Sequence, residues 1–288
     1  MSGGHNTQKY EEITMENLKA LSFELRRDII DMIYQAKTGH IGGDFSVLDI
    51  LVTLYYKHMN ITPQTQDDPN RDRFILSKGH SVEALYSVLA KKGFFPKSDL
   101  ETYSQFQSKY IGHPNNKVNG IEMNSGSLGH GLSVAVGMAL AGKMDHAPYR
   151  VYTVMGDGEL AEGSVWEGAM AAGHYKLDNL TAVVDRNRLQ ISGSTEEVMS
   201  QDSQDERWSS FGWNVIHATG NDIDALDEAF SRAKATKGMP TVIIADTIKG
   251  YGVSFIENSA PWHHRIPSRE EYEKAIAELE QRRLAANE

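Results

Sequence analysis

Short apolar runs that alternate with helical segments constrain the fold of this chain more than any other feature of its sequence. Most of these runs are rich in β-branched residues and lack polar alternation; they lie at residues 73–77, 150–155, 180–185, 213–219 and 241–247. Strands of this kind are typical of a parallel sheet that is covered on both faces. The helical segments between them complete βαβ units. The sequence therefore predicts an α/β fold with a doubly wound, mostly parallel sheet and helices on both faces.

The expected helices and domain limits follow from spacing and composition. Apolar residues recur at helical intervals over residues 14–37, and a charged helix is expected near the end of the chain. A short apolar helix should follow the glycine loop at 38–43, with Asp44 or Ser46 as its cap. No stretch is rich enough in Pro, Gly or Ser to divide the chain. We therefore expect one domain over residues 1–288, with a flexible N-terminus at residues 1–13.

Composition excludes several classes of function. The chain has no cysteine, which rules out disulfides, thiolate metal sites and thiol nucleophiles. Its formal charge of −10 argues against nucleic-acid binding, which requires clustered lysine and arginine. No run approaches the roughly 18 to 20 apolar residues of a membrane helix, and the N-terminus lacks a signal-peptide pattern. We expect a soluble, cytoplasmic protein that does not bind membranes.

Two polar residues follow neighbouring strands at the edge where an open parallel sheet binds its ligands. Asp157 stands between two glycines after the strand at 150–155, and Asn187 follows the next strand. A carboxylate beside an amide oxygen suits Mg²⁺ or Ca²⁺, with phosphate oxygens as further ligands. Gly156 and Gly158 would let a diphosphate approach the backbone. The sequence GDG alone is a common turn, and its pairing with "DRN" one βα unit later is what favours a site.

The segment from "GDGELAEG" to "VVDRNRLQISG" resembles the thiamine-diphosphate-binding motif of transketolases. Further motifs occur in transketolase order, including "TGHIGGDFS", "DRFILSKGHSVEALYSVL", "NSGSLGHGLSVAVGMA" and "TIKGYG", so that the resemblance covers about residues 18–264. It implies the thiamine-diphosphate-binding fold of the diphosphate-binding (PP-type) domain. It also implies thiamine diphosphate and Mg²⁺ as cofactors, with Ca²⁺ or Mn²⁺ as substitutes for Mg²⁺.

The resemblance assigns roles to individual residues. It implies that Asp157, Asn187 and the carbonyl of Leu189 hold the metal, and that Ile191 lies near the thiazolium ring. The other cofactor contacts that it implies are His80, Gly126, Leu128, Gly156, Gly158, Lys249 and His263. Glu162 corresponds to an acid at the dimer contact that couples paired sites.

The histidines in glycine-flanked loops carry the catalytic assignments. His40, His80 and His113 correspond to the histidines of the family's substrate channel, and His263 to one at the reacting centre. Imidazoles can exchange protons with sugar hydroxyls near neutral pH. The choice between His263 and its neighbour His264 is left open, as is the role of His130. For His5, His58, His146, His174 and His217 we expect structural roles.

In transketolases, the glutamate that activates the cofactor belongs to a pyrimidine-binding domain, which follows the domain matched here. Only 24 residues follow His264, too few for a further domain. The resemblance thus implies a split transketolase whose partner subunit carries the pyrimidine-binding and C-terminal domains, in an α₂β₂ heterotetramer acting on sugar phosphates. A truncated form of a fused enzyme would give a similar sequence. Whether the sugars belong to the pentose phosphate pathway or are unusual ketoses stays open.

Two rival hypotheses remain. The chain could belong to another thiamine-diphosphate enzyme, such as a deoxyxylulose-phosphate synthase or the α subunit of a 2-oxo acid dehydrogenase, but both fit the histidine and "NSGSLGHG" loops less well. It could also be a non-catalytic relative that keeps the fold. The intact Asp157, Asn187 and histidine set argue against a scaffold.

Overall fold

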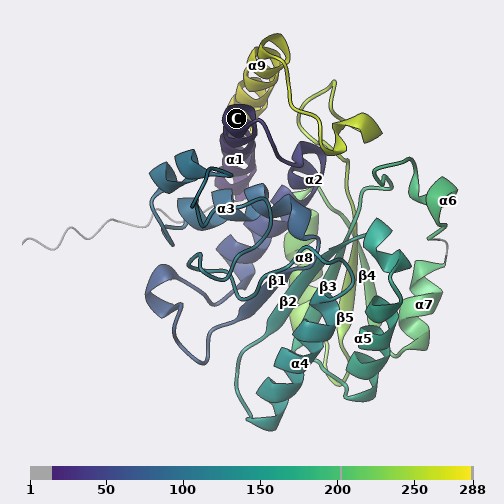
Figure 1. The fold of residues 1–288 in the computed structure, drawn as a ribbon. Helices are drawn as coiled ribbons and strands as arrows, with labels where there is room; N and C mark the ends of the chain where they lie inside the picture. Colours follow the sequence, from purple (N-terminus) through teal and green to yellow (C-terminus); the bar gives the residue numbers. More distant parts are fainter. Residues whose placement is uncertain (1–14, 202, 287–288) are drawn as a thin grey trace, which may run out of the picture.

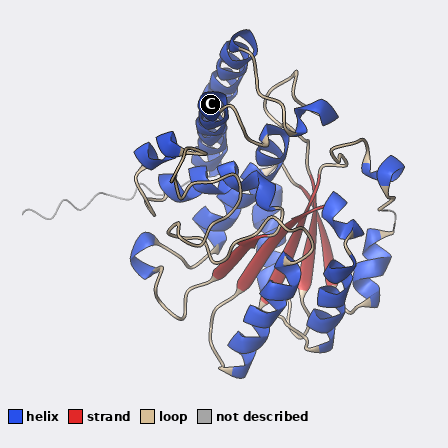
Figure 2. Ribbon diagram, in the orientation of Figure 1, coloured by secondary structure: helices blue, strands red, loops and turns tan. Residues whose placement is uncertain are grey.

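A computed structural model describes residues 15–201 and 203–286; the N-terminal segment 1–13, expected to be flexible, lies outside this part of the chain. Its centre is a parallel sheet in the order β1-β2-β3-β5-β4 (Figure 2). The strands are β1 (Arg73–Leu76), β2 (Val151–Gly156), β3 (Leu180–Arg186), β4 (Asn214–Thr219) and β5 (Thr241–Asp246). The predicted α/β class with a mostly parallel sheet is confirmed.

Helices cover both faces of this sheet (Figure 1). The core on one face includes residues of α1 (Met15–Ala36), α2 (Ile41–Thr53), α3 (Val82–Lys91), α8 (Ile223–Ala235) and α9 (Arg269–Ala285), of which α9 packs on α1. The other packs against α4 (Gly131–Met144), α5 (Gly163–His174) and α7 (Gln204–Ser210). Within β2, Tyr152 and Val154 belong to the first core, whereas Val151 and Met155 belong to the second. Because successive side chains enter opposite cores, the strands need apolar residues at nearly every position.

Short helical turns connect these elements. They are α6 (Thr195–Val198), the π-helical turn η1 (Leu54–His58), and the 3₁₀ turns η2 (Pro63–Thr65), η3 (Gly79–Ser81), η4 (Lys97–Thr102), η5 (Gly158–Ala161) and η6 (Ala260–His263). Among the described helices, none combines the length and apolarity needed to cross a membrane.

The start of α2 differs from the sequence-based expectation. The helix begins at Ile41, and its N-cap, His40, makes no side-chain capping hydrogen bond. Asp44 and Ser46 lie inside the helix, fully buried, so their prediction as caps is wrong. The backbone amides of Gly43 and Asp44 instead donate to the His40 carbonyl. The helix therefore starts at the histidine, and the two polar side chains are free to bond elsewhere.

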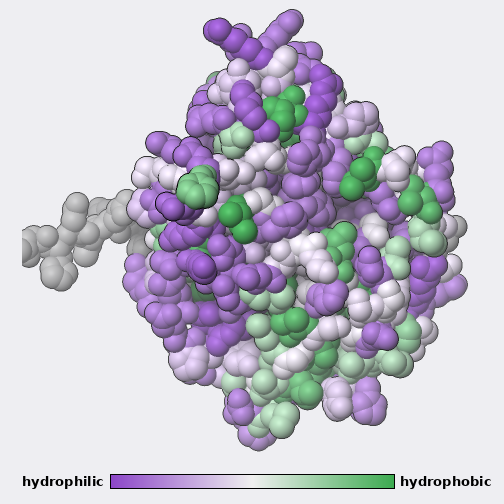
Figure 3. All heavy atoms as spheres, in the orientation of Figure 1, coloured by the Kyte–Doolittle hydropathy of each residue, from purple (hydrophilic) through white to green (hydrophobic). Residues whose placement is uncertain are grey.

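The outer surface of α4 and α5 is unusually apolar. Met144 is 72% exposed, Met170 56% and Tyr175 51%. Figure 3 shows hydrophobic side chains gathered over the part of this face where α4 and α5 lie in Figure 1. A surface of this kind is typical of a protein contact.

Candidate functional site

The predicted metal ligands lie together at the carboxyl end of the sheet. Asp157 follows β2 and Asn187 follows β3, two strands paired in register from Val151 and Leu180 to Gly156 and Asp185. Both side chains are almost fully buried. Asp157 accepts hydrogen bonds from the amides of Gly158 (2.8 Å) and Arg188 (2.6 Å), so its carboxylate bridges the two loops. Burial, and then the charge of Asp185, raises the pKa of Asp157 to about 6.

The Leu189 carbonyl, the third expected ligand, lies beside two other predicted residues. The Lys249 ammonium donates to this carbonyl at 3.3 Å and lies 3.0 Å from Nδ1 of His263. Lys249 is 2% exposed, and burial, followed by the charge of Lys78, lowers its pKa to about 8. A buried cation held by one carbonyl and one imidazole is poorly neutralised, which makes this corner of the site suited to an anion.

These residues fit a diphosphate with a divalent ion. Among the described residues, no group of three or more His, Cys, Asp or Glu side chains could hold a metal. One carboxylate, one amide oxygen and one carbonyl would therefore need phosphate oxygens to complete an octahedral site. A Cβ added at Gly156 would meet no atom within 4 Å, so space is open beside Asp157. The residues present suit a metal only together with a phosphorylated ligand.

Four imidazoles gather around that of His40. The ring centroid of His40 lies 5.5 Å from that of His80, 6.0 Å from His113, 5.6 Å from His263 and 4.6 Å from His264. Both candidates near residue 263 thus face the cluster, but only His263 also contacts Lys249. The structure brings together all four histidines that the sequence assigned to catalysis.

Burial favours the neutral form of four of these rings, those of His40, His80, His113 and His263. It is the largest cause that lowers the pKa of His40 to about 4 and that of His263 to about 3, and nearby cations act in the same direction. Burial likewise lowers the pKa of His80 and of His113. Neutral imidazoles each offer one donor and one acceptor, which suits hydroxyl groups of a sugar.

The predicted cofactor loop at residues 126–129 packs beside the histidines. Gly126 has φ +132°, and a Cβ there would lie 2.5 Å from Cδ2 of His113. The same loop touches Glu162, whose Cβ would lie 2.7 Å from a Cβ built on Gly129. Leu128 belongs to this loop, and its carbonyl oxygen lies 3.2 Å from Nδ1 of His130.

Three residues of interest have exposed side chains. Ile191 is 75% exposed, Glu162 lies on the surface, and His130 is an exposed residue before α4. Nδ1 of His130 contacts only the carbonyls of its own loop in the bonds that the structure describes. The ring of His130 makes no ring contact with the histidine cluster among the described residues. The structure does not join these three side chains to the buried centre.

Sequence reasoning missed a buried ion pair beneath the site. Lys78 and Asp185 form a salt bridge with side chains 1% and 0% exposed. Asp185 also accepts from the hydroxyls of Ser46 (2.7 Å) and Thr247, and Lys78 donates to the Gly43 carbonyl (3.2 Å). Both charged residues stand inside the quoted motifs, but a motif match does not show which side chains pair.

Glu159 is a second residue that was missed. One of its carboxylate oxygens accepts from the Gly129 amide (2.8 Å) and the other from the Gly156 amide (3.1 Å). It therefore ties the loop at 126–129 to the end of β2. Burial raises its pKa, and hydrogen bonds from Ser77 and the two amides oppose that shift.

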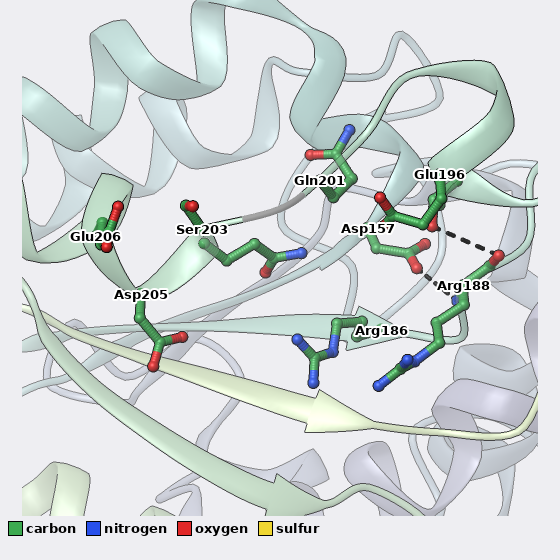
Figure 4. Close-up of a pocket in the computed structure, with 10 residues that line it drawn as sticks. Asp157, Arg186, Arg188, Glu196, Gln201, Ser203, Asp205 and Glu206 are labelled. Carbon is green, nitrogen blue, oxygen red and sulfur yellow. Dashed lines mark hydrogen bonds between the residues drawn. The ribbon is translucent and has the colours of Figure 1, made fainter.

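A cavity of about 330 Å³ opens beside Asp157 (Figure 4). Arg186 and Arg188 lie on one side of it, and both pair with Asp246. Glu196, Asp205 and Glu206 also line the cavity. With the arginines already paired and three more acids present, the cavity itself does not favour an anion.

Comparison with known proteins agrees with this arrangement. The chain matches the family described as transketolase, thiamine diphosphate binding domain, over residues 19–278. It is 49% identical over 268 residues to an apulose-4-phosphate transketolase subunit of Phocaeicola vulgatus, covering 93% of this chain and 95% of that protein. It is 42% identical over 257 residues to the 6-deoxy-6-sulfo-D-fructose transketolase subunit SqwG of a Clostridium species, covering 89% and 94%.

A solved structure of transketolase from Campylobacter jejuni superimposes with a TM-score of 0.86 at 29% identity. The match covers 96% of this chain but only 46% of that one, whereas the two subunits above are matched over nearly their whole length. The chain therefore belongs to the transketolase family and corresponds to its thiamine-diphosphate-binding domain.

Proposed function

We propose that this chain is the diphosphate-binding subunit of a split transketolase and that, with a partner subunit, it transfers a two-carbon ketol unit from a ketose to an aldose. The observation that carries the proposal is the meeting of three features at one sheet edge. These are the oxygen ligands around Asp157, the poorly neutralised cation of Lys249 and the neutral histidine cluster. A diphosphate with its metal and a sugar beside them would satisfy all three.

We assign the cofactor contacts as follows. Asp157, Asn187 and the Leu189 carbonyl would hold Mg²⁺, while Lys249 and His263 would contact the diphosphate. The backbone at Gly156 and Gly158 would lie against the same group, with Gly126 and Leu128 at the aminopyrimidine and Ile191 near the thiazolium. When bound, the cofactor supplies a nucleophilic carbon that cleaves the C2–C3 bond of a ketose and carries the two-carbon unit.

The histidine cluster would orient the sugar and exchange protons with its hydroxyl groups. The pKa values of His40, His80, His113 and His263 lie below the usual value, so these rings are neutral at physiological pH. Each ring can therefore accept a proton from one hydroxyl or donate a hydrogen bond to another without first losing a charge.

The partner subunit would supply the pyrimidine-binding and C-terminal domains, including the glutamate that activates the cofactor. The exposed apolar surface of α4 and α5, with Glu162 at its edge, supports a subunit contact there. We infer an α₂β₂ assembly that works in the cytoplasm. Relatives are named for apulose 4-phosphate and 6-deoxy-6-sulfo-D-fructose. We infer a ketose with an anionic group at its far end, such as a sugar phosphate.

Reconstitution of the complex from its subunits tests whether ketol transfer requires the partner. The purified chain alone should show no ketol transfer, and adding the partner with thiamine diphosphate and Mg²⁺ should restore it. Turnover by the chain alone would contradict the need for a second subunit. A complex that binds no cofactor in calorimetry, with or without Mg²⁺, would favour a non-catalytic role.

Two substitutions test the metal site. Asp157→Ala or Asn187→Ala should abolish Mg²⁺-dependent cofactor retention by the complex while far-ultraviolet circular dichroism stays unchanged. Asp67→Ala removes an exposed acid and serves as the matched control. Retention by either site variant at the level of the control would contradict the assignment.

A further inference from the structure

Two buried carboxyl groups lie next to each other where α2 meets α3, since the amide of Ala84, the residue after Glu83, donates to Asp44, and nothing in the proposed function uses them. Asp44 stands in the first turn of α2 and Glu83 in the first turn of α3. Both are 0% exposed. Charged side chains are almost never buried this completely unless they are paired. Lys78 is the cation whose charge acts on Asp44, but it is bonded to Asp185.

The hydrogen bonds of the two groups are complementary. Oδ1 of Asp44 accepts from the Ala84 amide (3.0 Å), and Oε1 of Glu83 accepts from the Tyr103 hydroxyl (2.5 Å). Within the described residues, no donor reaches the remaining oxygen of either carboxyl, Oδ2 of Asp44 or Oε2 of Glu83. If both groups were ionised, two bare oxygens and two like charges would be buried together. A proton on one group removes this conflict, because its hydroxyl can donate to the other.

The electrostatics agree on which group holds the proton. Burial is the largest cause that raises the pKa of both, that of Asp44 well above its usual range and that of Glu83 to about 7. A hydrogen bond from Asp44 to Glu83 would raise the pKa of Asp44 and lower that of Glu83. Tyr103 and the backbone amides near Glu83 also favour its charged form. Asp44 is therefore the protonated member at neutral pH.

The pair is tied to the backbone that carries His40. Gly39 has φ +148°, and a Cβ at this position would lie 2.8 Å from Oε1 of Glu83. The backbone amide of Asp44 donates to the His40 carbonyl (3.1 Å). The backbone before His40 therefore packs against the Glu83 carboxylate, and the backbone after it belongs to the helical turn that holds Asp44.

We propose that Asp44 and Glu83 share one proton, with the acid of Asp44 donating to the carboxylate of Glu83, and that this pair fixes the backbone of His40. The two acids are positioning residues, since they act on the substrate only through His40. This role rests on the proposed function, in which His40 faces the sugar. The shared proton itself does not depend on any activity.

Substitution of the two acids by amides tests whether they share one proton. In Asp44→Asn, the side-chain NH₂ replaces the donated hydroxyl; in Glu83→Gln, the NH₂ donates to Asp44, which then holds the charge. Each single variant therefore keeps a donor opposite an acceptor. The double variant Asp44→Asn/Glu83→Gln places two NH₂ groups face to face. Hydrogen exchange of the peptide at 38–44 in the purified chain should stay within about threefold for each single variant and rise at least tenfold beyond their combined effect in the double variant.

Infrared spectroscopy supplies a measurement that does not require the double variant to fold. The wild-type chain at pH 8 should show the carbonyl stretch of a protonated carboxylic acid, and Asp44→Asn should remove it. Additive effects in hydrogen exchange, or the absence of this band, would overturn the shared proton.

Activity of the complex tests the positioning role. The double variant should lose at least tenfold in kcat/KM while retaining its cofactor. Each single variant should keep most of the wild-type kcat/KM. Full activity in a double variant whose exchange is accelerated would overturn the link to His40. Absence of ketol transfer by a wild-type complex with normal exchange and infrared spectra would count against the proposed function, not against the pair.

Discussion

Replacing Lys78 by methionine should destabilise the chain strongly, because it leaves the charge of Asp185 buried without its cation. The two side chains are 1% and 0% exposed, so water cannot take the place of the ammonium. Breaking a buried ion pair by removing one partner costs about 3–5 kcal/mol. The carboxylate keeps its hydrogen bonds from Ser46 and Thr247. We therefore expect a loss in the lower part of this range, about 3–4 kcal/mol, in the free energy of unfolding.

Urea and thermal unfolding of the purified chain measure this loss. With an unfolding entropy of about 2.1 cal/mol/K per residue, the melting temperature should fall by about 5–7 °C for a chain of 288 residues. Lys143→Met is the control: its ion pair with Asp178 is partly exposed and should contribute less than about 1 kcal/mol.

The double variant Lys78→Met/Asp185→Asn separates charge from packing. It removes both charges; the amide oxygen can accept from one of the two hydroxyls, Ser46 or Thr247, and the NH₂ group can donate to the oxygen of the other. We expect it to recover all but about 1–2 kcal/mol. The reasoning is refuted if Lys78→Met unfolds within about 1 kcal/mol of the wild type, or if the double variant is no more stable than the single one.

Three further predictions concern the site. Lys249→Met should weaken diphosphate binding by the complex about 10- to 100-fold in calorimetry, since a charged hydrogen bond contributes about 1.5–3 kcal/mol. The melting temperature of the chain should stay unchanged or rise, because the buried cation that is removed is poorly neutralised. A large fall in melting temperature would contradict this account. Gly126→Ala should lower the free energy of unfolding by about 1–3 kcal/mol, because Gly126 has a φ of +132° and a Cβ there would contact His113. Gly137 is an exposed helical position where a Cβ would meet no atom within 4 Å, so Gly137→Ala should raise the free energy of unfolding by about 0.5–1 kcal/mol. Equal effects of the two variants in urea unfolding would argue against the loop geometry. The folded-state pKa of His263 is about 3, so below pH 6.5 the unfolded chain binds a proton at this residue that the folded chain does not bind. Relative to His263→Gln, the free energy of unfolding of the wild type should therefore fall by roughly 1 kcal/mol between pH 7 and pH 4. Parallel curves of stability against pH for the two proteins would rule this out.

The sequence predicts what depends on local pattern and on strand order. The continuous apolar strands indicated a parallel sheet with two covered faces, and the GDG and DRN motifs after neighbouring strands located Asp157 and Asn187 at one edge. The histidines could be grouped because their loops follow elements that end at the same edge. These inferences need only the directions of the strands.

Pairings between distant side chains could not be predicted in the same way. Lys78 and Asp185 are 107 positions apart, and their contact depends on how the loop after β1 lies against β3 in three dimensions. Asp44 was predicted as a helix cap from its residue type, yet the helix starts three residues earlier and Asp44 meets Glu83 of another helix. Tertiary packing decided both cases.

The pairing of β2 with β3 has a consequence for how such a protein can change over evolution. The distance between the loops of Asp157 and Asn187 is set by the separation of adjacent strands, about 4.8 Å, and not by flexible side chains. Mutations in peripheral helices and loops can therefore leave the spacing of these two loops constant. If the loops bind the cofactor as proposed, new substrate preferences can arise without a change in cofactor binding.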